Sequence, residues 1–487
     1  MTLVPRATLR FAEKRELILD GAARQFNRRG IKNGTLAEVA ASVGLATNSL
    51  TYYYRKKEDL VCACLERSIE AMDAVVADAA ALAPAGDLAG RVRALVHGFV
   101  GMVAAIAERR RPALIFFGDM RALPQPQAGP VFAAYVNMFR RLRGLLHEAQ
   151  HGAAAPLPAD TPARRALNAR SHLLLSQLLW SRAWLGRYEP GDYPRVAQAM
   201  VDVLLNGLAA AGQPWPADES WPDRVDPVPP LAQADELREA YLRTATRLVN
   251  DHGVGGASVE RIAATLELTK GSFYHHHDTK HTLIDDCFER SFALIRGAQL
   301  AALATPGTGW QRLLAATVPL VRLQTSAQGP LLRLTAWTEL PGELRWQKLN
   351  AMNRLGERYA AMIVDGMVDG SLRLLDPAVA AQMVNGLVNA LAEAEHWLPG
   401  DGPPRLDELL ARPMLLGLRA DRSGQPGQPE GPQQPPHPQQ PPHPQQPPQP
   451  PQPPQPQQPQ QPQQPQQPQQ PPQPQPRAQE AVGLGAS

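Results

Sequence analysis

The sequence of 487 residues predicts an all-α protein made of two tandem units and a disordered C-terminal tail. Apolar residues recur at helical spacing through both halves, and the alternation typical of strands is absent. A segment near the N-terminus recurs in the middle of the chain, which indicates a duplicated unit. The end of the chain is rich in Pro and Gln and has almost no apolar side chains, so it cannot bury a core.

The internal repeat can be aligned without a gap. Residues 15–68 match residues 238–291 at an offset of 223 (238 − 15), and 17 of the 54 aligned positions are identical. The identical pairs include Arg15/Arg238, Asn27/Asn250, Gly30/Gly253, Cys64/Cys287, Arg67/Arg290 and Ser68/Ser291. So many identities in an ungapped comparison exceed chance, and we interpret them as a duplication.

The repeat and the composition divide the chain into six segments. Each half has a head, which contains the repeat, and a longer helical body, and a Pro-rich linker that favours an extended spacer joins the halves. The predicted segments are the first head at 1–68, the first body at 69–212, the linker at 213–232, the second head at 233–291, the second body at 292–419 and the tail at 420–487.

The composition excludes several classes of protein. The net charge is only +3, and the three cysteines (Cys62, Cys64 and Cys287) are too few for a disulfide framework, which fits a reducing cytoplasm. The sequence has no run of 18 apolar residues, so we expect no membrane span, and the N-terminus lacks the apolar stretch of a secretory signal. The motifs of serine hydrolases, phosphate-binding loops and zinc enzymes are missing, so we expect no enzyme activity and no cofactor.

A group of histidines in the second head raises the question of a metal site. His275, His276 and His277 are consecutive, and His281 follows four residues after the last of them. Consecutive helical residues point about 100° apart, so only His277 and His281 share a face. Two ligands without a nearby carboxylate or cysteine do not make a zinc site, and we expect no metal there.

Each copy of the repeat can be laid out as three short helices. In the first head, residues 13–29 form a helix that ends at Gly30, and Thr35 with Glu38 predicts a capping box at the start of the next helix. Gly44 then makes a tight turn into a third helix. Two helices joined by a short glycine turn are the helix-turn-helix arrangement, whose second helix lies in the major groove of DNA.

The stretch TLAEVAASVGLATNSLTYYYRKKEDL, which starts at Thr35, resembles the signature of the TetR/AcrR family of bacterial regulators. That signature reads Thr-x-x-x-Ile-Ala-x-x-x-Gly-Val, followed by Tyr-x-x-Phe-x-x-Lys-Glu-x-Leu. The second copy, SVERIAATLELTKGSFYHHHDTKHTL from Ser258, is similar to it as well, most closely in the segment Thr269–His275. The resemblance covers both heads, whereas the bodies agree with the family only in length and helicity.

The resemblance implies a cytoplasmic bacterial transcription repressor that joins the nucleoid when it binds its double-stranded DNA operator. Each head would bind DNA, and each body would bind an unknown small-molecule effector and dimerise. The helices predicted around 163–187 and 193–212 resemble the dimerisation helices of the family, with 376–397 and 404–417 as their counterparts. An effector releases the operator only if it binds the two head arrangements with different affinity.

The family's DNA contacts carry over onto hydroxyl, amide, imidazole and lysine side chains, which suit phosphates and base edges. In the first head they correspond to Thr35, Thr47, Asn48, Ser49, Tyr52, Tyr53 and Lys57. In the second head they correspond to Ser258, Lys270, Gly271, Ser272, Tyr274, His275, His276 and Lys280.

The two heads depart from the family pattern to different degrees. Thr51 replaces a usual Tyr in the first head, whereas in the second Glu267 replaces the turn glycine, His277 an aromatic residue and His281 a Glu. Residues 1–68 carry 12 Lys/Arg and 7 Asp/Glu (12 − 7 = +5), and residues 235–291 carry 7 and 10 (7 − 10 = −3). We therefore expect the first head to bind DNA more strongly. The alternative is a protein-interaction module whose second head has lost DNA binding and serves dimerisation only.

The bodies hold aromatic and polar residues that are candidates for an effector cavity, since such cavities are mostly apolar with few polar groups. The candidates are Phe117, Trp180, Trp184, Trp337 and Trp346, with His97, His172 and Arg182 as polar anchors. Plain core packing is the competing interpretation for each of them. The chain pairs either its own two halves, as a pseudo-dimer, or with a second chain, and the linker's effective concentration favours the pseudo-dimer.

Overall fold

The computed structural model of the protein describes residues 6–31, 34–115, 120, 123, 127–159, 161–216, 233–269, 271, 279–333, 336, 340, 342–391, 397–398 and 405–420. All of them fall within one unit, Met1–Pro426. The predicted tail lies outside the described residues except for Ala420, and the predicted linker is described only at residues 213–216.

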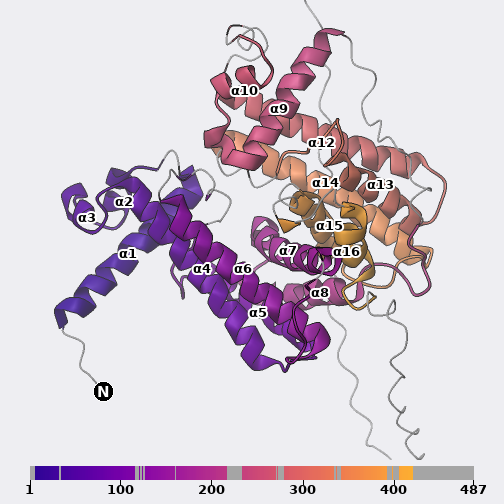
Figure 1. Ribbon diagram of the computed structural model, residues 1–487, viewed down its shortest axis with the longest axis horizontal. Helices are drawn as coiled ribbons and strands as arrows, with labels where there is room; N and C mark the ends of the chain where they lie inside the picture. Colours follow the sequence, from indigo (N-terminus) through magenta and orange to yellow (C-terminus); the bar gives the residue numbers. More distant parts are fainter. Residues whose placement is uncertain are drawn as a thin grey trace, which may run out of the picture. The chain divides into compact units, whose positions relative to one another are not determined.

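The first half is a succession of helices, coloured indigo to magenta in Figure 1. Its head contains α1 (Arg6–Arg29), α2 (Leu36–Ser42) and α3 (Thr47–Tyr53). Helix α4 (Lys57–Leu82) begins in the head and continues into the body, which also contains α5 (Leu88–Ala107), α6 (Ala128–His151), α7 (Thr161–Trp184), η2 (Leu185–Arg187), η3 (Pro190–Asp192) and α8 (Tyr193–Asn206).

The second half repeats this order in pink to orange (Figure 1). It contains α9 (Gln233–Gly256), α10 (Val259–Thr265), α12 (Lys280–Ala304), α13 (Gly309–Leu323), α14 (Gly342–Val368), α15 (Pro377–Leu391), η7 (Asp407–Ala411) and α16 (Arg412–Leu416). The first helix turns at Gly253, with φ of 71°, as α1 ends at Gly30, with φ of 77°. Among the described residues there is no β-strand, only a bridge between Ala209 and Leu372. The predicted all-α fold with two tandem units is confirmed.

One helix, α5, is long and apolar enough to cross a membrane by length and composition alone. In the structure it packs against α4, α6 and α8 as a core helix of the first body, with Leu95 and Val96 fully buried. It also carries the buried Arg91, whose Nη1 donates to Leu145 O at 3.1 Å and to Glu148 Oε2 at 3.0 Å. These partners satisfy the buried guanidinium within the helical core.

Several residues that are identical in the two copies of the repeat make equivalent contacts in both halves. Asn27 Nδ2 donates to Leu114 O at 2.8 Å, and Asn250 Nδ2 donates to Leu331 O at 2.8 Å. In each half the accepting carbonyl belongs to the segment that follows the second long helix of the body. The repeated asparagine therefore fastens the first helix of the head to the body.

Arginine and serine pairs of the repeat hold the same junction. Arg67 Nη1 lies 3.1 Å from Glu16 Oε2, and Arg290 Nε lies 2.6 Å from Glu239 Oε1. Ser68 Oγ accepts from Ile115 N at 3.1 Å, and the equivalent Ser291 Oγ accepts from Leu332 N at 2.9 Å. The duplication has thus retained the side chains that join α4 to α1 and to the segment after α5, and α12 to α9 and to the segment after α13.

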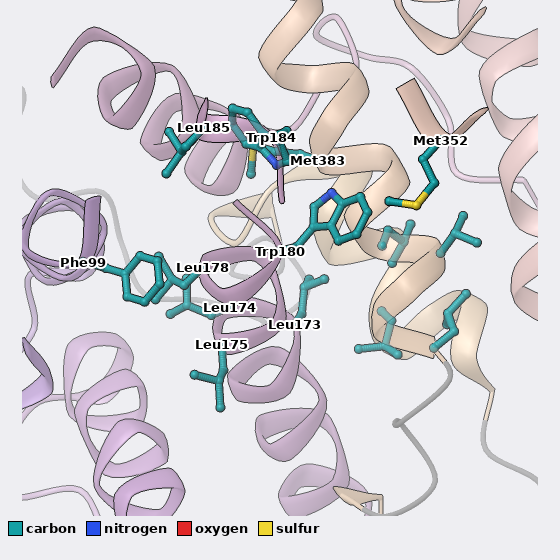
Figure 2. Close-up of a cluster of buried hydrophobic side chains, with 14 of the residues drawn as sticks. Phe99, Leu173, Leu174, Leu175, Leu178, Trp180, Trp184, Leu185, Met352 and Met383 are labelled. Atoms are coloured by element: carbon teal, nitrogen blue, oxygen red, sulfur yellow. The ribbon is translucent and has the colours of Figure 1, made fainter. Parts of the chain in front are cut away.

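The halves meet through α7 and α15, and three α7 side chains hydrogen-bond to α15 carbonyls. Trp180 Nε1 donates to Gln382 O at 2.8 Å, Gln177 Nε2 donates to Met383 O at 2.9 Å, and His172 Nε2 lies 2.8 Å from Ala390 O. Figure 2 shows the Trp180 ring pointing away from Phe99 of the first body and toward Met352 of α14. The core is therefore continuous between the halves.

Small residues on α15 make room for the large side chains on α7. A Cβ atom added to Gly386 would lie 2.6 Å from Trp180 Cδ1 and 2.6 Å from Gln177 Oε1, closer than van der Waals contact allows. Ala390 is likewise small and lies opposite His172. The two helices therefore differ in side-chain size at this interface, since α7 carries the large residues and α15 the small ones.

Candidate nucleic-acid interface

The second helix of the first head, α2, begins with the predicted capping box. Thr35 Oγ1 accepts from Glu38 N at 3.2 Å, and Glu38 Oε2 accepts from Thr35 N at 3.1 Å. The backbone hydrogen bond from Thr35 lowers the pKa of the Glu38 carboxyl, and Arg29 at the end of α1 forms an ion pair with it. The Thr35 hydroxyl and the Glu38 carboxylate thus each satisfy one backbone donor that an isolated helix start would leave open.

The turn between α2 and α3 depends on Gly44, whose φ is 69°. No atom lies within 4 Å of the position a Cβ would take, so the requirement is conformational and not steric. Val39 and Leu50, one from each helix, are fully buried. The turn and the burial of these two apolar side chains fix the angle between α2 and α3.

The exposed face of α3 carries the predicted DNA contacts of the first head. Thr47, Asn48 and Ser49 are exposed, and Tyr52 is 77% exposed although it is a large aromatic residue. Residues three and four apart share a helix face, so Asn48, Ser49 and Tyr52 form one polar surface. Such a surface can offer amide, hydroxyl and phenol groups to base edges and phosphates.

An aromatic cluster supports this surface from behind. The Tyr53 ring stacks on Phe11 of α1 with 4.9 Å between ring centroids, and Tyr52 meets Tyr53 edge-on at 5.4 Å. Tyr53 is half-buried. Because its ring contacts both Phe11 and Tyr52, it helps to orient the exposed Tyr52 ring. The remaining predicted residues, Thr35 and Lys57, stand at the starts of α2 and α4, Thr35 exposed and Lys57 half-buried.

Two residues that sequence reasoning did not single out hold α3 to α1. Arg15 Nε donates to Tyr54 Oη at 3.1 Å, and Tyr54 directly follows α3. Burial raises the pKa of Tyr54, and the hydrogen bond to Tyr54 raises that of Arg15. Two features of the sequence could have indicated this contact. Arg15 is identical in both copies of the repeat, and Tyr54 aligns with the aromatic position of the family signature.

The second head keeps the framework of the first but strains its turn. Ser258 caps α10 by accepting from Arg261 N at 3.2 Å. Glu267 stands where the first head has Gly44, and its φ is 58°, in the left-handed region. That conformation costs a residue with a side chain about 1–2 kcal/mol.

The recognition segment of the second head falls mostly outside the described residues. This holds for the predicted residues Lys270, Ser272, Tyr274, His275 and His276, and for His277. Gly271 is exposed, and Lys280 is half-buried at the start of α12. Within the described part of the chain, no group of three or more His, Cys, Asp or Glu side chains is arranged to hold a metal ion.

The predicted effector-binding residues occupy several different environments. His172 and Trp180 are buried between the halves, where their ring nitrogens contact α15 as described above. Trp184 is buried, His97 is half-buried in α5, and Trp346 is 67% exposed on α14. Phe117 and Trp337 lie outside the described residues. The assignment of these side chains to an effector stays a prediction.

Arg182, the last candidate, connects α7 to the junction of head and body. Its Nη2 donates to Leu114 O at 3.2 Å, the same carbonyl that accepts from Asn27. Burial lowers the pKa of Arg182 to about 10. One carbonyl oxygen therefore joins the helix at the interface of the halves to the first helix of the head.

A cavity of about 300 Å³ opens beside this junction. It is lined by charged side chains from α1, α4 and the segment after α5, among them Glu16, Arg67, Glu70 and Arg111. A shallower groove of about 680 Å³ lies between α8 and the start of α15, lined by Arg195, Asp202 and Asp376. None of the predicted effector-binding residues that the structure describes lines either space.

Comparison with known proteins agrees with the repeat. Residues 18–64 and 242–287 both match the family model described as bacterial regulatory proteins, tetR family. The HTH-type transcriptional regulator AcrR of Shigella flexneri is 26% identical over 202 residues, which cover 40% of this chain and 88% of AcrR. The two segments that match the family model lie within the two predicted heads.

Three solved structures are each similar to one part of the chain. Apo AibR is 25% identical, with a TM-score of 0.31 over 36% of this chain and 95% of AibR. The TetR-family regulator PfmR of Thermus thermophilus is 24% identical, with a TM-score of 0.30 over 37% of this chain and 98% of PfmR. AibR in complex with isovaleryl coenzyme A and operator DNA is 22% identical, with a TM-score of 0.32 over 37% and 97%.

Proposed function

Because the chain belongs to the TetR family of bacterial regulatory proteins and carries two tandem units, we propose that it is a cytoplasmic repressor of transcription that a small-molecule effector releases from its operator. The observation that carries the proposal is the exposed polar face of α3 on a head with a charge of +5. In this proposal the protein acts by recognising DNA and an effector, and not by catalysis.

In this proposal the first head makes the main contact with DNA. Asn48 and Tyr52, on one face of α3, read base edges, and Thr35 and Lys57, at the starts of α2 and α4, bind the phosphates on either side. Phosphate contacts fix the register of a recognition helix, and base contacts supply the specificity. The second head contributes less affinity, because its net charge is −3 and its turn holds Glu267 in a left-handed conformation.

We propose further that the two halves of one chain form the functional pseudo-dimer. The contacts between α7 and α15 have an internal two-fold pattern when Gly207, which ends α8, is equated with Gly417, which ends α16. At that offset of 210 (417 − 207), His172 corresponds to Gln382 and Trp180 to Ala390. The two hydrogen bonds from Trp180 to Gln382 and from His172 to Ala390 are then related by the pseudo-two-fold axis.

The same offset explains why a chain would pair its own halves. It places Ser176 opposite Gly386 (386 − 210 = 176) at the centre of the interface, where a Cβ on Gly386 would collide with Gln177 and Trp180. Two α7 helices from different chains would bring serine to that position and tryptophan to the position of Ala390. Large side chains would then collide across an α7–α7 pair. The pairing of α7 with α15 is therefore favoured both by its own hydrogen bonds and by the steric exclusion of the α7–α7 pair.

Selection of bound fragments from a pool of random-sequence duplex DNA, followed by footprinting, tests the proposed function. We expect one recurrent DNA motif that the full-length protein protects. The protection should be lost when Asn48 is replaced by alanine. A pool that shows no enrichment over several rounds would contradict sequence-specific binding. Protection that persists with unchanged affinity in Asn48→Ala would contradict the role of α3.

A further inference from the structure

The N-terminal part of α14, in the second body, contacts the first head. Arg345 Nη1 donates to Asn27 O at 3.1 Å and to Arg28 O at 2.8 Å, and its Nη2 donates to Leu340 O at 3.3 Å. Asn27 and Arg28 belong to the last turn of α1, where an α-helix leaves its final carbonyls without intrahelical partners. A cation is favoured at that end of a helix by the helix dipole.

One turn further along α14, Lys348 contacts the connecting helix of the second half. Its Nζ lies 2.7 Å from Asp285 Oδ1 and 2.6 Å from Glu289 Oε1, both on α12. Although burial opposes the charge of this side chain, which is only 4% exposed, its hydrogen bonds to the two carboxylates raise the pKa of Lys348. Lys348 is therefore charged and paired, and removing either the lysine or its carboxylate partners would leave an uncompensated buried charge.

Helix α12 is in turn tied to the second head. It begins at Lys280, next to the recognition segment, and Arg290 on it pairs with Glu239 on α9 at 2.6 Å. The first two turns of α14 therefore touch the end of α1 in one head and the helix that carries the other. Arg345 and Lys348 are three residues apart, which is a rise of about 4.5 Å along a rigid helix.

We propose that this part of α14 is a brace that holds the two heads at a fixed spacing, with Arg345 as a positioning residue for DNA binding by the first head. The inference rests on the proposed function, because spacing matters only when both heads meet one DNA molecule. It also has a regulatory consequence. A ligand that shifts α14 in the second body changes the position of the first head, so binding to one half is linked to DNA affinity in the other.

The experiment uses full-length protein and the duplex selected from the random pool, with base pairs inserted or deleted between its two half-sites. For the unaltered protein we expect affinity to peak at one spacing and to fall tenfold or more within two base pairs of it. Arg345→Gln should flatten the profile and lower the peak affinity about tenfold. Affinity for a duplex with only the first half-site should not change. Arg354→Gln, which alters an exposed arginine on the same helix, should keep the original profile.

The possible failures are distinguishable. A sharp profile in both the unaltered protein and Arg345→Gln overturns the brace and leaves the proposed function standing, whereas no spacing preference in the unaltered protein contradicts the proposed two-headed binding itself. If Arg345→Gln lowers the thermal unfolding midpoint, Arg345→Lys replaces it. Lysine keeps the cation but lacks the planar fork with which Arg345 binds the α1 carbonyls through Nη1 and Leu340 O through Nη2. The brace predicts a flattened profile for Arg345→Lys at an unchanged midpoint, and an original profile overturns it.

Discussion

Gly207 and Gly417 cross so closely that neither position has room for a side chain. A Cβ on Gly207 would lie 2.6 Å from Gly417 N, and a Cβ on Gly417 would lie 2.5 Å from Gly207 N. The flanking backbones pair as well, with Leu208 N donating to Leu415 O at 2.7 Å and Leu418 N donating to Leu204 O at 2.9 Å. The ends of the two halves are thus joined reciprocally by main-chain atoms.

Gly417→Ala is expected to lower the free energy of unfolding by about 2–4 kcal/mol. The methyl group would collide with the backbone around Gly207, and φ of 91° is costly for any residue with a Cβ. Urea denaturation measures the change. Gly212→Ala is the matched control, because Gly212 has φ of 81° but open space around it. Equal losses in both variants would show that the conformation matters and the crossing does not.

Glu267→Gly is expected to stabilise the second head by about 1 kcal/mol. Glycine adopts the left-handed conformation at this turn without a steric penalty, and part of the gain is offset by its greater freedom in the unfolded chain. Hydrogen exchange of the amides in α9 and α10 measures the local stability. The reciprocal variant, Gly44→Glu, should speed exchange in α1 and α2. Unchanged exchange in both would contradict the assigned strain.

The side chains of α3 and Lys57 should affect DNA binding differently. Asn48→Ala and Tyr52→Ala are expected to weaken the selected site by about 1–3 kcal/mol and random DNA much less, because they remove base contacts. Lys57→Ala should weaken both kinds of DNA alike and reduce the slope of log affinity against log salt by about one. Fluorescence anisotropy titrations at several salt concentrations measure both effects, and equal losses on both DNAs from all three variants would contradict the roles.

Acid should weaken the ion pair between Asp407 and Arg322. Burial opposes the charge of Asp407, but the hydrogen bond from Arg322 Nη2 at 2.8 Å outweighs it and lowers the pKa of the carboxyl below its ordinary 3.8. A lowered folded-state pKa contributes stability above the unfolded value, and that stability is lost as the pH falls through the folded value. Asp407→Asn should therefore be destabilising at pH 7, and its difference from the unaltered protein should shrink below pH 3.8.

The control for this prediction is Asp78→Asn, since Asp78 is an exposed carboxylate on α4. Its difference from the unaltered protein is expected to stay close to zero at every pH. Urea denaturation from pH 3 to pH 7 measures both variants. A destabilisation by Asp407→Asn that is the same at pH 3 and pH 7 would show that the ion pair does not contribute through its charge.

The elements of the first head could be predicted because their signals are local. Gly30, Gly44 and the pair Thr35–Glu38 each determine a turn or a cap within a few residues, and the structure has all of them. The fold class followed from the same helical periodicity. The signature also directed attention to the exposed face of α3, although it gave no indication that Arg15 and Tyr54 hold this helix in place.

The junctions between distant segments could not be predicted. Nothing in the spacing of the sequence indicates that Arg182 and Asn27 share the carbonyl of Leu114, or that Arg345 reaches α1. Such contacts depend on how helices far apart in the chain come to lie against one another, which periodicity does not encode. The pairing of Trp180 with the space above Gly386 has the same origin.

The mass of the particle in solution, combined with a footprint of the selected site, decides whether the two halves of one chain form the functional pseudo-dimer. We expect a particle of 53.0 kDa, the mass of one chain, that protects an asymmetric site with two different half-sites about one helical turn apart. Light scattering with the protein alone and bound to DNA gives the mass. A particle of twice that mass on a perfect palindrome would contradict the pseudo-dimer, because each chain would then supply one half of a symmetric dimer.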